Sequence, residues 1–140
     1  MLTLWVPGTP VQQGSLIARL IWAGGKPHAV LHSHASADLK RWRKIVAEAV
    51  RATGHPEVGP YVAVAATFHM PKPRTTKYPD YPAGTPDLDK LQRAIGDALT
   101  ESGIVADDAR IVRWHVDEVW AGGLGSTMPT PGVSLTIGPR

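Results

Sequence analysis

The acidic side chains best suited to catalysis are concentrated in one stretch of the sequence. Asp87 and Asp89 lie where a helix is expected to begin, and Asp107 and Asp108 lie in the turn that follows this helix. Carboxylate oxygens are the ligands that Mg²⁺ and Mn²⁺ prefer, and a metal ion bound to them can activate water for attack on a phosphodiester bond. The chain has no cysteine, which excludes disulfides and thiolate metal sites. The pattern therefore indicates a carboxylate metal site for hydrolysis.

A basic residue follows these acids at helical spacing. Arg93 lies one turn beyond Asp89, so both side chains are expected on the same helix face, where the guanidinium can hold a phosphate group. Asp97 lies one further turn along this face and is expected to form an ion pair with Arg93. This position gives Asp97 a supporting role next to the metal site.

Some of these acids have simpler interpretations, which stay open at the level of sequence. Asp87 and Asp89 can serve only to favour the positive end of the helix dipole. Asp107 is expected to be a turn or capping residue more than a direct metal ligand, which leaves it in a supporting place beside Asp108.

Other polar and aromatic residues are not expected to form a site. Asp117 and Glu118 are adjacent in a predicted strand, so they fall on opposite faces and do not form a pair. The six histidines show no metal-ligand spacing, and His32 and His34 are interpreted as surface or packing residues. Among the tryptophans, only Trp22, close to a predicted hairpin turn, is a candidate for stacking on an unpaired base.

The chain is mildly basic, with a formal net charge of +3 and a pI near 9.5. A basic surface favours a polyanionic partner such as DNA. The basic residues gather on one face of the first predicted helix and in the loop before the second. The expected DNA contacts are Lys40, Arg43 and Lys44 on the helix, Lys72, Arg74 and Lys77 in the loop, and Lys90. The helix face can equally be an ordinary solvated surface.

Hydrophobic periodicity and turn residues divide the chain into strands and helices. Strands are expected over residues 3–6, 15–22, 28–32, 61–70, 109–121 and 133–137, and helices over residues 36–53 and 85–103. Ser36 is expected to cap the first helix, and Gly24-Gly25 to turn a hairpin. The nearly continuous apolar strand 61–70 is expected inside a sheet. The length of 140 residues fits a single domain, 1–140.

The second predicted helix separates the two pairs of acids. About 16 residues of helix span roughly 24 Å. Asp87 and Asp89 can therefore meet Asp108 only if the loop after the helix folds back, or if the helix begins later than Asp89. The sequence leaves both routes open.

The chain lacks the features of a membrane or secreted protein. No apolar run approaches the roughly 20 residues that a membrane span needs, and the N-terminus lacks the layout of a signal peptide. A soluble protein of the cytoplasm, without a membrane partner, is expected.

The acidic stretch also carries a motif. Asp87-Leu88-Asp89 is followed by Leu91-Gln92 with the basic Arg93, then by Asp97-Ala98-Leu99, and finally by Gly103 and Asp107-Asp108-Ala109. In this pattern the chain resembles the RusA-like Holliday junction resolvases, small homodimeric endonucleases of bacteria and their phages. The resemblance is close over residues 86–112, extends to His69-Met70-Pro71, and is loose over the first 35 residues.

The resemblance implies a function and a fold. It implies that Asp87, Asp89 and Asp108 are the catalytic, metal-binding carboxylates, with Mg²⁺ or Mn²⁺ as cofactor. It implies an α+β fold, with two main helices on a small mixed β-sheet, and a homodimer that nicks opposing strands of a four-way DNA junction. The family's lysine is replaced by Arg93, which keeps the hold on phosphate but cannot readily donate a proton. Lys90 stands where the family often has a neutral polar residue.

Two other functions remain open. The chain can be a basic DNA-binding accessory in recombination or phage genome packaging, in which case the acidic cluster is structural. It can also be a nuclease for forks or flaps, which differs from a junction resolvase only in specificity. Cleavage assays on four-way, three-way and linear DNA distinguish these alternatives.

Overall fold

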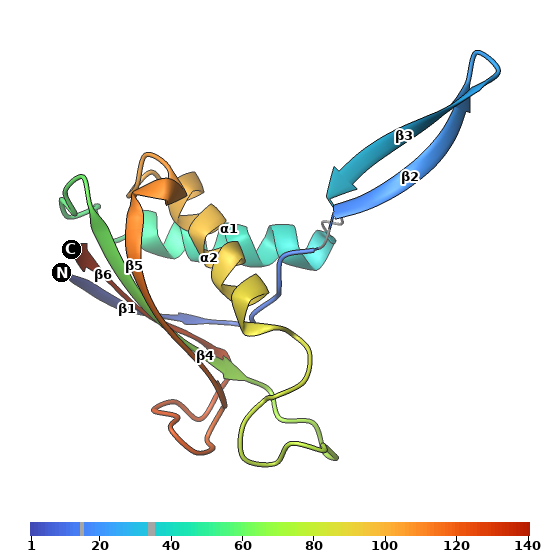
Figure 1. Cartoon of the computed structure of the whole chain (residues 1–140). Helices are drawn as coiled ribbons and strands as arrows, with labels where there is room; N and C mark the ends of the chain where they lie inside the picture. Colours follow the sequence, from blue (N-terminus) through green and yellow to red (C-terminus); the bar gives the residue numbers. More distant parts are fainter. Residues whose placement is uncertain (15, 34–35) are drawn as a thin grey trace.

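The computed structural model describes residues 1–14, 16–33 and 36–140, and within residues 16–23 and 28–33 it describes the backbone alone (Figure 1). Its strands are β1 (Leu2–Pro7), β2 (Leu16–Ala23), β3 (Lys26–Ser33), β4 (Val62–Met70), β5 (Ile111–Trp120) and β6 (Gly132–Pro139). Its helices are α1 (Ala37–Arg51), α2 (Leu88–Ser102) and a 3-10 turn, η1 (Asp108–Arg110).

Four strands form a mixed sheet in the order β1-β6-β4-β5. The β1–β6 and β6–β4 pairs are antiparallel, and the β4–β5 pair is parallel. Strand β4 lies inside the sheet, which confirms the prediction made from its apolar character. Strand β5 is at the edge, and its N-terminal end follows directly on η1.

Both long helices pack on one face of this sheet and enclose the core (Figure 1). On β4 the fully or nearly fully buried Val62, Val64 and Phe68 alternate with half-buried residues, as expected for a strand with one face against the helices. The helices contribute buried stripes that include Trp42 on α1 and Ile95 on α2. The architecture is α+β, with two main helices on a small mixed sheet, which confirms the expected fold class.

The helix ends follow from local sequence. The Ser36 hydroxyl accepts a hydrogen bond of 3.0 Å from the Leu39 amide, which confirms Ser36 as the cap of α1. Helix α2 begins at Leu88, three residues after the expected start at Thr85, and has Asp87 at its N-cap position. It ends at Gly103, whose φ of +85° is the left-handed conformation that glycine adopts most easily.

The hairpin of β2 and β3 forms a separate two-stranded sheet that projects away from the helices and the main sheet (Figure 1). Its turn is Gly24-Gly25, with φ angles of +61° and +76°, as predicted for a tight hairpin. Trp22, His32 and His34, which the sequence analysis considered, lie outside the residues whose side chains are described.

In the described part of the chain, no helix is both long enough and apolar enough to cross a membrane. The single domain over residues 1–140 and the homodimer stay predictions.

Candidate active site

Helix α2 and strand β5 lie close together and run in opposite directions, because the chain turns back after Gly103 (Figure 1). A Cβ atom built on Gly96 would lie 3.6 Å from the Asp108 Cβ atom and 3.7 Å from both Asp108 Oδ2 and Trp114 Cζ2. Asp108 is therefore level with Gly96, six residues before the last residue of α2, or roughly 9 Å back along its axis. The sequence left open whether the loop after the helix folds back or the helix begins later than Asp89, and the structure shows that the loop folds back.

The acids at the start of α2 are not used to cap the helix. Asp87 occupies the N-cap position, yet its side chain makes no capping hydrogen bond. Its amide donates a 2.9 Å hydrogen bond to Gln12 Oε1, and its Oδ2 atom lies 3.7 Å from Lys90 Nζ. Asp89 is exposed in the first turn. Both acids stand at the positive end of the helix dipole, so the dipole interpretation stays open, but Asp87 does not cap the helix by a side-chain hydrogen bond.

A carboxyl that the sequence analysis set aside joins Asp87 from the neighbouring strand. Glu118 belongs to the half-buried row of β5, together with Trp114 and Val116, while Asp117 is exposed. Burial, and secondarily the negative charge of Asp87, raise the pKa of Glu118 to about 7. The sequence showed that Glu118 and Asp117 point to opposite faces, but the relevant partner lies on α2. The signal that was missed is the period of two that Glu118 shares with Trp114 and Val116.

The acids of the return loop form a second pair. Asp107 Oδ1 accepts a 2.8 Å hydrogen bond from the Ala109 amide, which confirms its expected capping role. This bond is the main reason why the pKa of Asp107 is lowered, followed by a hydrogen bond from Asp108. The same carboxyl–carboxyl hydrogen bond, with burial and the charges of Asp107 and Asp97, raises the pKa of Asp108. The two neighbouring acids therefore have pKa values shifted in opposite directions.

Asp97 has a different partner from the one expected. Its Oδ2 atom lies 3.6 Å from Arg43 Nη1, and Arg43 Nε lies 3.3 Å from Glu101 Oε1. The predicted Asp97–Arg93 ion pair is therefore replaced, because α1 packs against α2 and brings a cation that helical spacing cannot reveal. Arg43, expected to contact DNA, has only 20% of its side chain exposed and is held between the helices instead.

Asp97, Asp107 and Asp108 line a shallow hollow of about 320 Å³ between α1, α2 and the return loop. Its lining residues are Arg43, Asp97, Thr100, Glu101, Asp107 and Asp108. Asp89 and Gly96 are seven residues apart on α2, or roughly 10 Å along the axis. Within the described residues, no group of three or more histidine, aspartate or glutamate side chains is arranged to hold a metal ion. The structure thus pairs Asp87 with Glu118, and Asp108 with Asp107 and Asp97, as two separate groups.

Comparison with protein families gives one match. A family model described as endodeoxyribonuclease RusA matches residues 7–127, which include both acid groups. The chain belongs to this family. The resemblance carried by the motif of residues 87–109 is confirmed, and the activity is that of a RusA endodeoxyribonuclease, which acts on Holliday junctions. The family favours a nuclease over a non-catalytic accessory. Curated proteins provide no match.

The basic residues of this RusA-family chain lie on exposed surfaces around α1 and the loop after β4. Lys40 and Lys44 are exposed on α1, where Lys44 lies 3.9 Å from Glu48. Arg74 and Lys77 are exposed in the loop. Lys72 Nζ donates a 2.9 Å hydrogen bond to the Pro79 carbonyl, which ties one end of the loop to the other.

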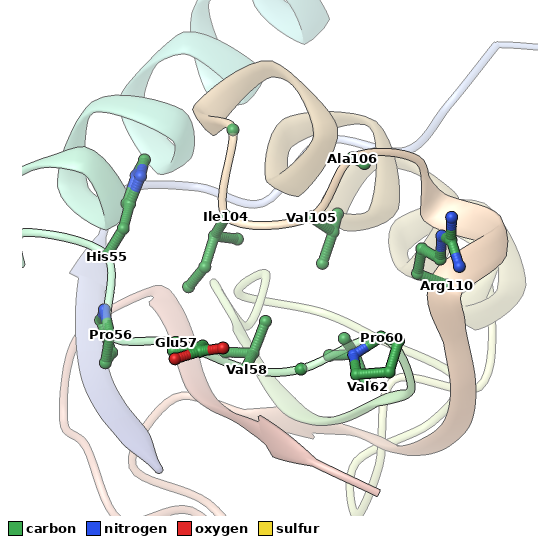
Figure 2. Close-up of a pocket in the computed structure, with 12 residues that line it drawn as sticks. His55, Pro56, Glu57, Val58, Pro60, Val62, Ile104, Val105, Ala106 and Arg110 are labelled. Carbon is green, nitrogen blue, oxygen red and sulfur yellow. The ribbon is translucent and has the colours of Figure 1, made fainter.

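A wider cavity of about 590 Å³ lies at the far end of α2, between the segment after α1 and the turn after α2 (Figure 2). Figure 2 shows His55 and Val58 on one side and Ile104, Val105 and Arg110 on the other. None of the acids of either group lines this cavity. It is therefore separate from the candidate active site, although its floor includes the return loop.

Proposed function

We propose that this RusA-family protein is a divalent-metal-dependent nuclease that resolves Holliday junctions by paired nicks, with Asp87, Asp89 and Asp108 as metal-binding carboxylates. The observation that carries this proposal is the fold-back of the return loop, which places Asp108 against Gly96 on α2. With it, Asp108 lies level with Gly96, about two helical turns from Asp89 on the same helix face, instead of beyond the C-terminal end of α2.

The donor set fits a hard divalent cation. All the acidic side chains of both groups offer oxygen, and Mg²⁺ and Mn²⁺ prefer oxygen ligands. In each group two carboxyls lie close enough that one raises the pKa of the other, Asp87 acting on Glu118 and Asp107 on Asp108. Such close negative groups are unfavourable unless a positive charge compensates them. When bound, a divalent cation supplies that charge, polarises the phosphoryl group and lowers the pKa of a bound water.

The side chains at the start of α2 have two roles in this proposal, metal binding and stabilisation of the phosphate charge. The Asp87 side chain makes no capping hydrogen bond and its Oδ2 atom lies 3.7 Å from Lys90 Nζ, and Asp89 stands two residues later on the first turn of α2. Arg93 is exposed one turn beyond Asp89, where its guanidinium neutralises charge on the scissile phosphate. Arginine remains protonated, so Arg93 acts by electrostatic stabilisation and not by proton transfer.

Binding to the junction relies on exposed cations of α1 and the loop after β4, together with the partly buried Lys90. Lys72, Arg74 and Lys77 in the loop, Lys40 and Lys44 on α1, and Lys90 on α2 contact backbone phosphates. Each neutralised phosphate adds about 0.9 to the slope of binding against salt. Two copies of the chain, as a homodimer, place one nick in each of two opposing strands.

The test is cleavage of a synthetic four-way junction with Mg²⁺, with Mn²⁺ and with a chelator. We expect cleavage with either metal and none with the chelator. Asp87→Asn, Asp89→Asn and Asp108→Asn should each reduce cleavage by at least about 100-fold while junction binding persists, because only the ligands of the cation are changed. Asp87→Asn protein that still cuts at the wild-type rate contradicts the assignment. Junction binding without cleavage by the wild type contradicts the nuclease itself.

A further inference from the structure

The register of the sheet fixes the direction in which Glu118 points. Glu118 is the neighbour of Phe68 in the parallel pairing of β4 and β5, and Phe68 is fully buried on the face covered by the helices. The half-buried Trp114 and Val116 precede Glu118 at intervals of two and pack against the same core. Trp114 lies against α2 at Gly96. Glu118 is therefore placed further along the same face, towards the start of α2.

One oxygen of Glu118 is in an unfavourable environment. The Oε2 atom is buried and has no hydrogen-bond partner. An unpartnered buried polar atom destabilises the fold, and more so when it carries charge. Native proteins keep such atoms rarely, and an ion at that position is one of the established reasons. Four strand residues from Trp114 to Glu118 span about 13 Å, and the nine residues from Gly96 back to Asp87 span a similar length of helix. Because Trp114 lies against Gly96 and the two elements run in opposite directions, Glu118 is level with the start of α2, where Asp87 stands.

From these observations we infer that Glu118 is a fourth carboxylate of the metal site and binds, through Oε2, the divalent cation that Asp87 and Asp89 hold. This inference rests on the proposed metal-dependent function and adds a ligand that comes from the sheet instead of the helix. A cation at that point gives the buried oxygen a partner and separates two like charges. It also links the first turn of α2 to the edge strand of the sheet.

A purely structural role of Glu118 leads to a different expectation. A neutral carboxyl buried beside Phe68 would be replaced equally well by glutamine, which has nearly the same shape and no charge. Glutamine keeps one carbonyl oxygen but is a much weaker ligand for a hard cation than a carboxylate. Glu118→Gln therefore distinguishes a ligand from a packing residue.

The experiment measures Mn²⁺ binding to the full-length, metal-free protein by isothermal titration calorimetry. The variants are Glu118→Gln, Glu118→Ala, Asp89→Asn and the control Asp117→Asn. Asp117 is the matched control, since it is the adjacent acid on the exposed face of β5, 3.4 Å from His115 Nε2. We expect both Glu118 variants to weaken Mn²⁺ binding at least about tenfold, a loss seen even for residues that only orient metal ligands. Asp117→Asn should leave the affinity unchanged, and thermal unfolding monitored by circular dichroism verifies that each variant is folded.

The possible results separate this inference from the proposed function. If Asp89→Asn loses Mn²⁺ while a folded Glu118→Gln keeps wild-type affinity, the role of Glu118 is refuted and the proposed function stands. If the wild type does not bind Mn²⁺, both are refuted. If Glu118→Gln, Glu118→Ala and Asp117→Asn all weaken binding equally, the effect is general electrostatics and the inference fails. Loss in the Glu118 variants alone supports it.

Discussion

The two acid groups beside α2 are built differently, although both combine close carboxyls. At the start of the helix, Asp87 makes no capping bond and Glu118 has a buried oxygen without a partner. In the return loop, Asp107 accepts a hydrogen bond from the Ala109 amide and caps η1, and the neighbouring Asp107 raises the pKa of Asp108. In the first group the buried Glu118 Oε2 atom has no partner. In the second group Asp107 is the structural acid, and Asp108, which lies against Gly96, is the proposed metal ligand.

The largest effect is expected when the two acids of the return loop are substituted one at a time and the variants are compared. Asp108→Asn should reduce junction cleavage by at least about 100-fold, because it removes a metal ligand. Asp107→Asn should reduce cleavage by less than about tenfold, since an asparagine oxygen still accepts the hydrogen bond from the Ala109 amide. Single-turnover cleavage of a four-way junction at saturating Mg²⁺ measures both. Equal losses in the two variants would show that the loop acts as one unit and that the distinction drawn here is wrong.

A second prediction concerns the contact that holds Asp108 against α2. Gly96→Ala adds a methyl group at ordinary contact distance from Asp108 and Trp114, and alanine favours helix by about 1 kcal/mol over glycine. This variant should keep its activity and unfold at a slightly higher temperature. Gly96→Leu overfills the contact, at about 1–3 kcal/mol, and should push Asp108 away.

We therefore expect Gly96→Leu to lose about tenfold or more in cleavage and to bind Mn²⁺ more weakly, because a displaced Asp108 no longer contributes to the proposed metal site. Mn²⁺ titration of the same variant measures this loss of affinity. A Gly96→Leu protein that is folded and fully active would mean that Asp108 need not stay against the helix.

Local sequence signals predicted most of the fold. Hydrophobic periodicity predicted both helices and the inner strand β4. The cap at Ser36, the helix end at Gly103 and the Gly24-Gly25 turn could be predicted because each depends on only a few neighbouring residues. Strand β5 was expected from residue 109 but begins at Ile111, since Asp107 caps a 3-10 turn first. The catalytic roles that the motif implies for Asp87, Asp89 and Asp108 stay predictions.

Contacts between distant segments were not predictable in the same way. Asp97 was assigned to Arg93, one turn away, whereas its partner Arg43 comes from the other helix. For Glu118 the sequence suggested only its neighbour Asp117 as a possible partner, whereas the charge that raises its pKa is that of Asp87 on α2. Both depend on how α1, α2 and β5 pack, which no single period in the sequence encodes. The fold-back of Asp108 onto Gly96 is of the same kind.

A third prediction compares a mostly buried cation with an exposed one, both on α1. Arg43 is mostly buried between two carboxylates, and removing one partner of such a network costs more than removing an exposed one. Arg43→Met should lower the free energy of unfolding by about 1–2 kcal/mol, whereas Lys44→Met, whose exposed ammonium lies 3.9 Å from Glu48, should change it by about 0.5 kcal/mol or less. Urea denaturation at low salt measures both variants, and the reverse order would contradict the comparison.

The smallest effect expected is a pH dependence of stability that comes from Glu118 in the metal-free protein. Its pKa is about 7 in the folded chain against an ordinary value of 4.5, so the fold favours the protonated carboxyl. The stability from this preference is complete below about pH 4.5 and is lost as the pH rises through 7. Because the side chain is partly exposed, solvent screening reduces the loss to on the order of 1 kcal/mol.

Glu118→Gln has no carboxyl to ionise, so the difference between wild type and variant isolates this contribution, while Asp108 titrates equally in both. Urea denaturation between pH 5 and 8 in a chelator should show wild-type protein losing stability relative to Glu118→Gln as the pH rises. Parallel profiles would mean that Glu118 ionises freely and that its oxygens are satisfied. With saturating Mn²⁺ the difference should reverse in sign, because the carboxylate that weakens the metal-free fold then binds the cation.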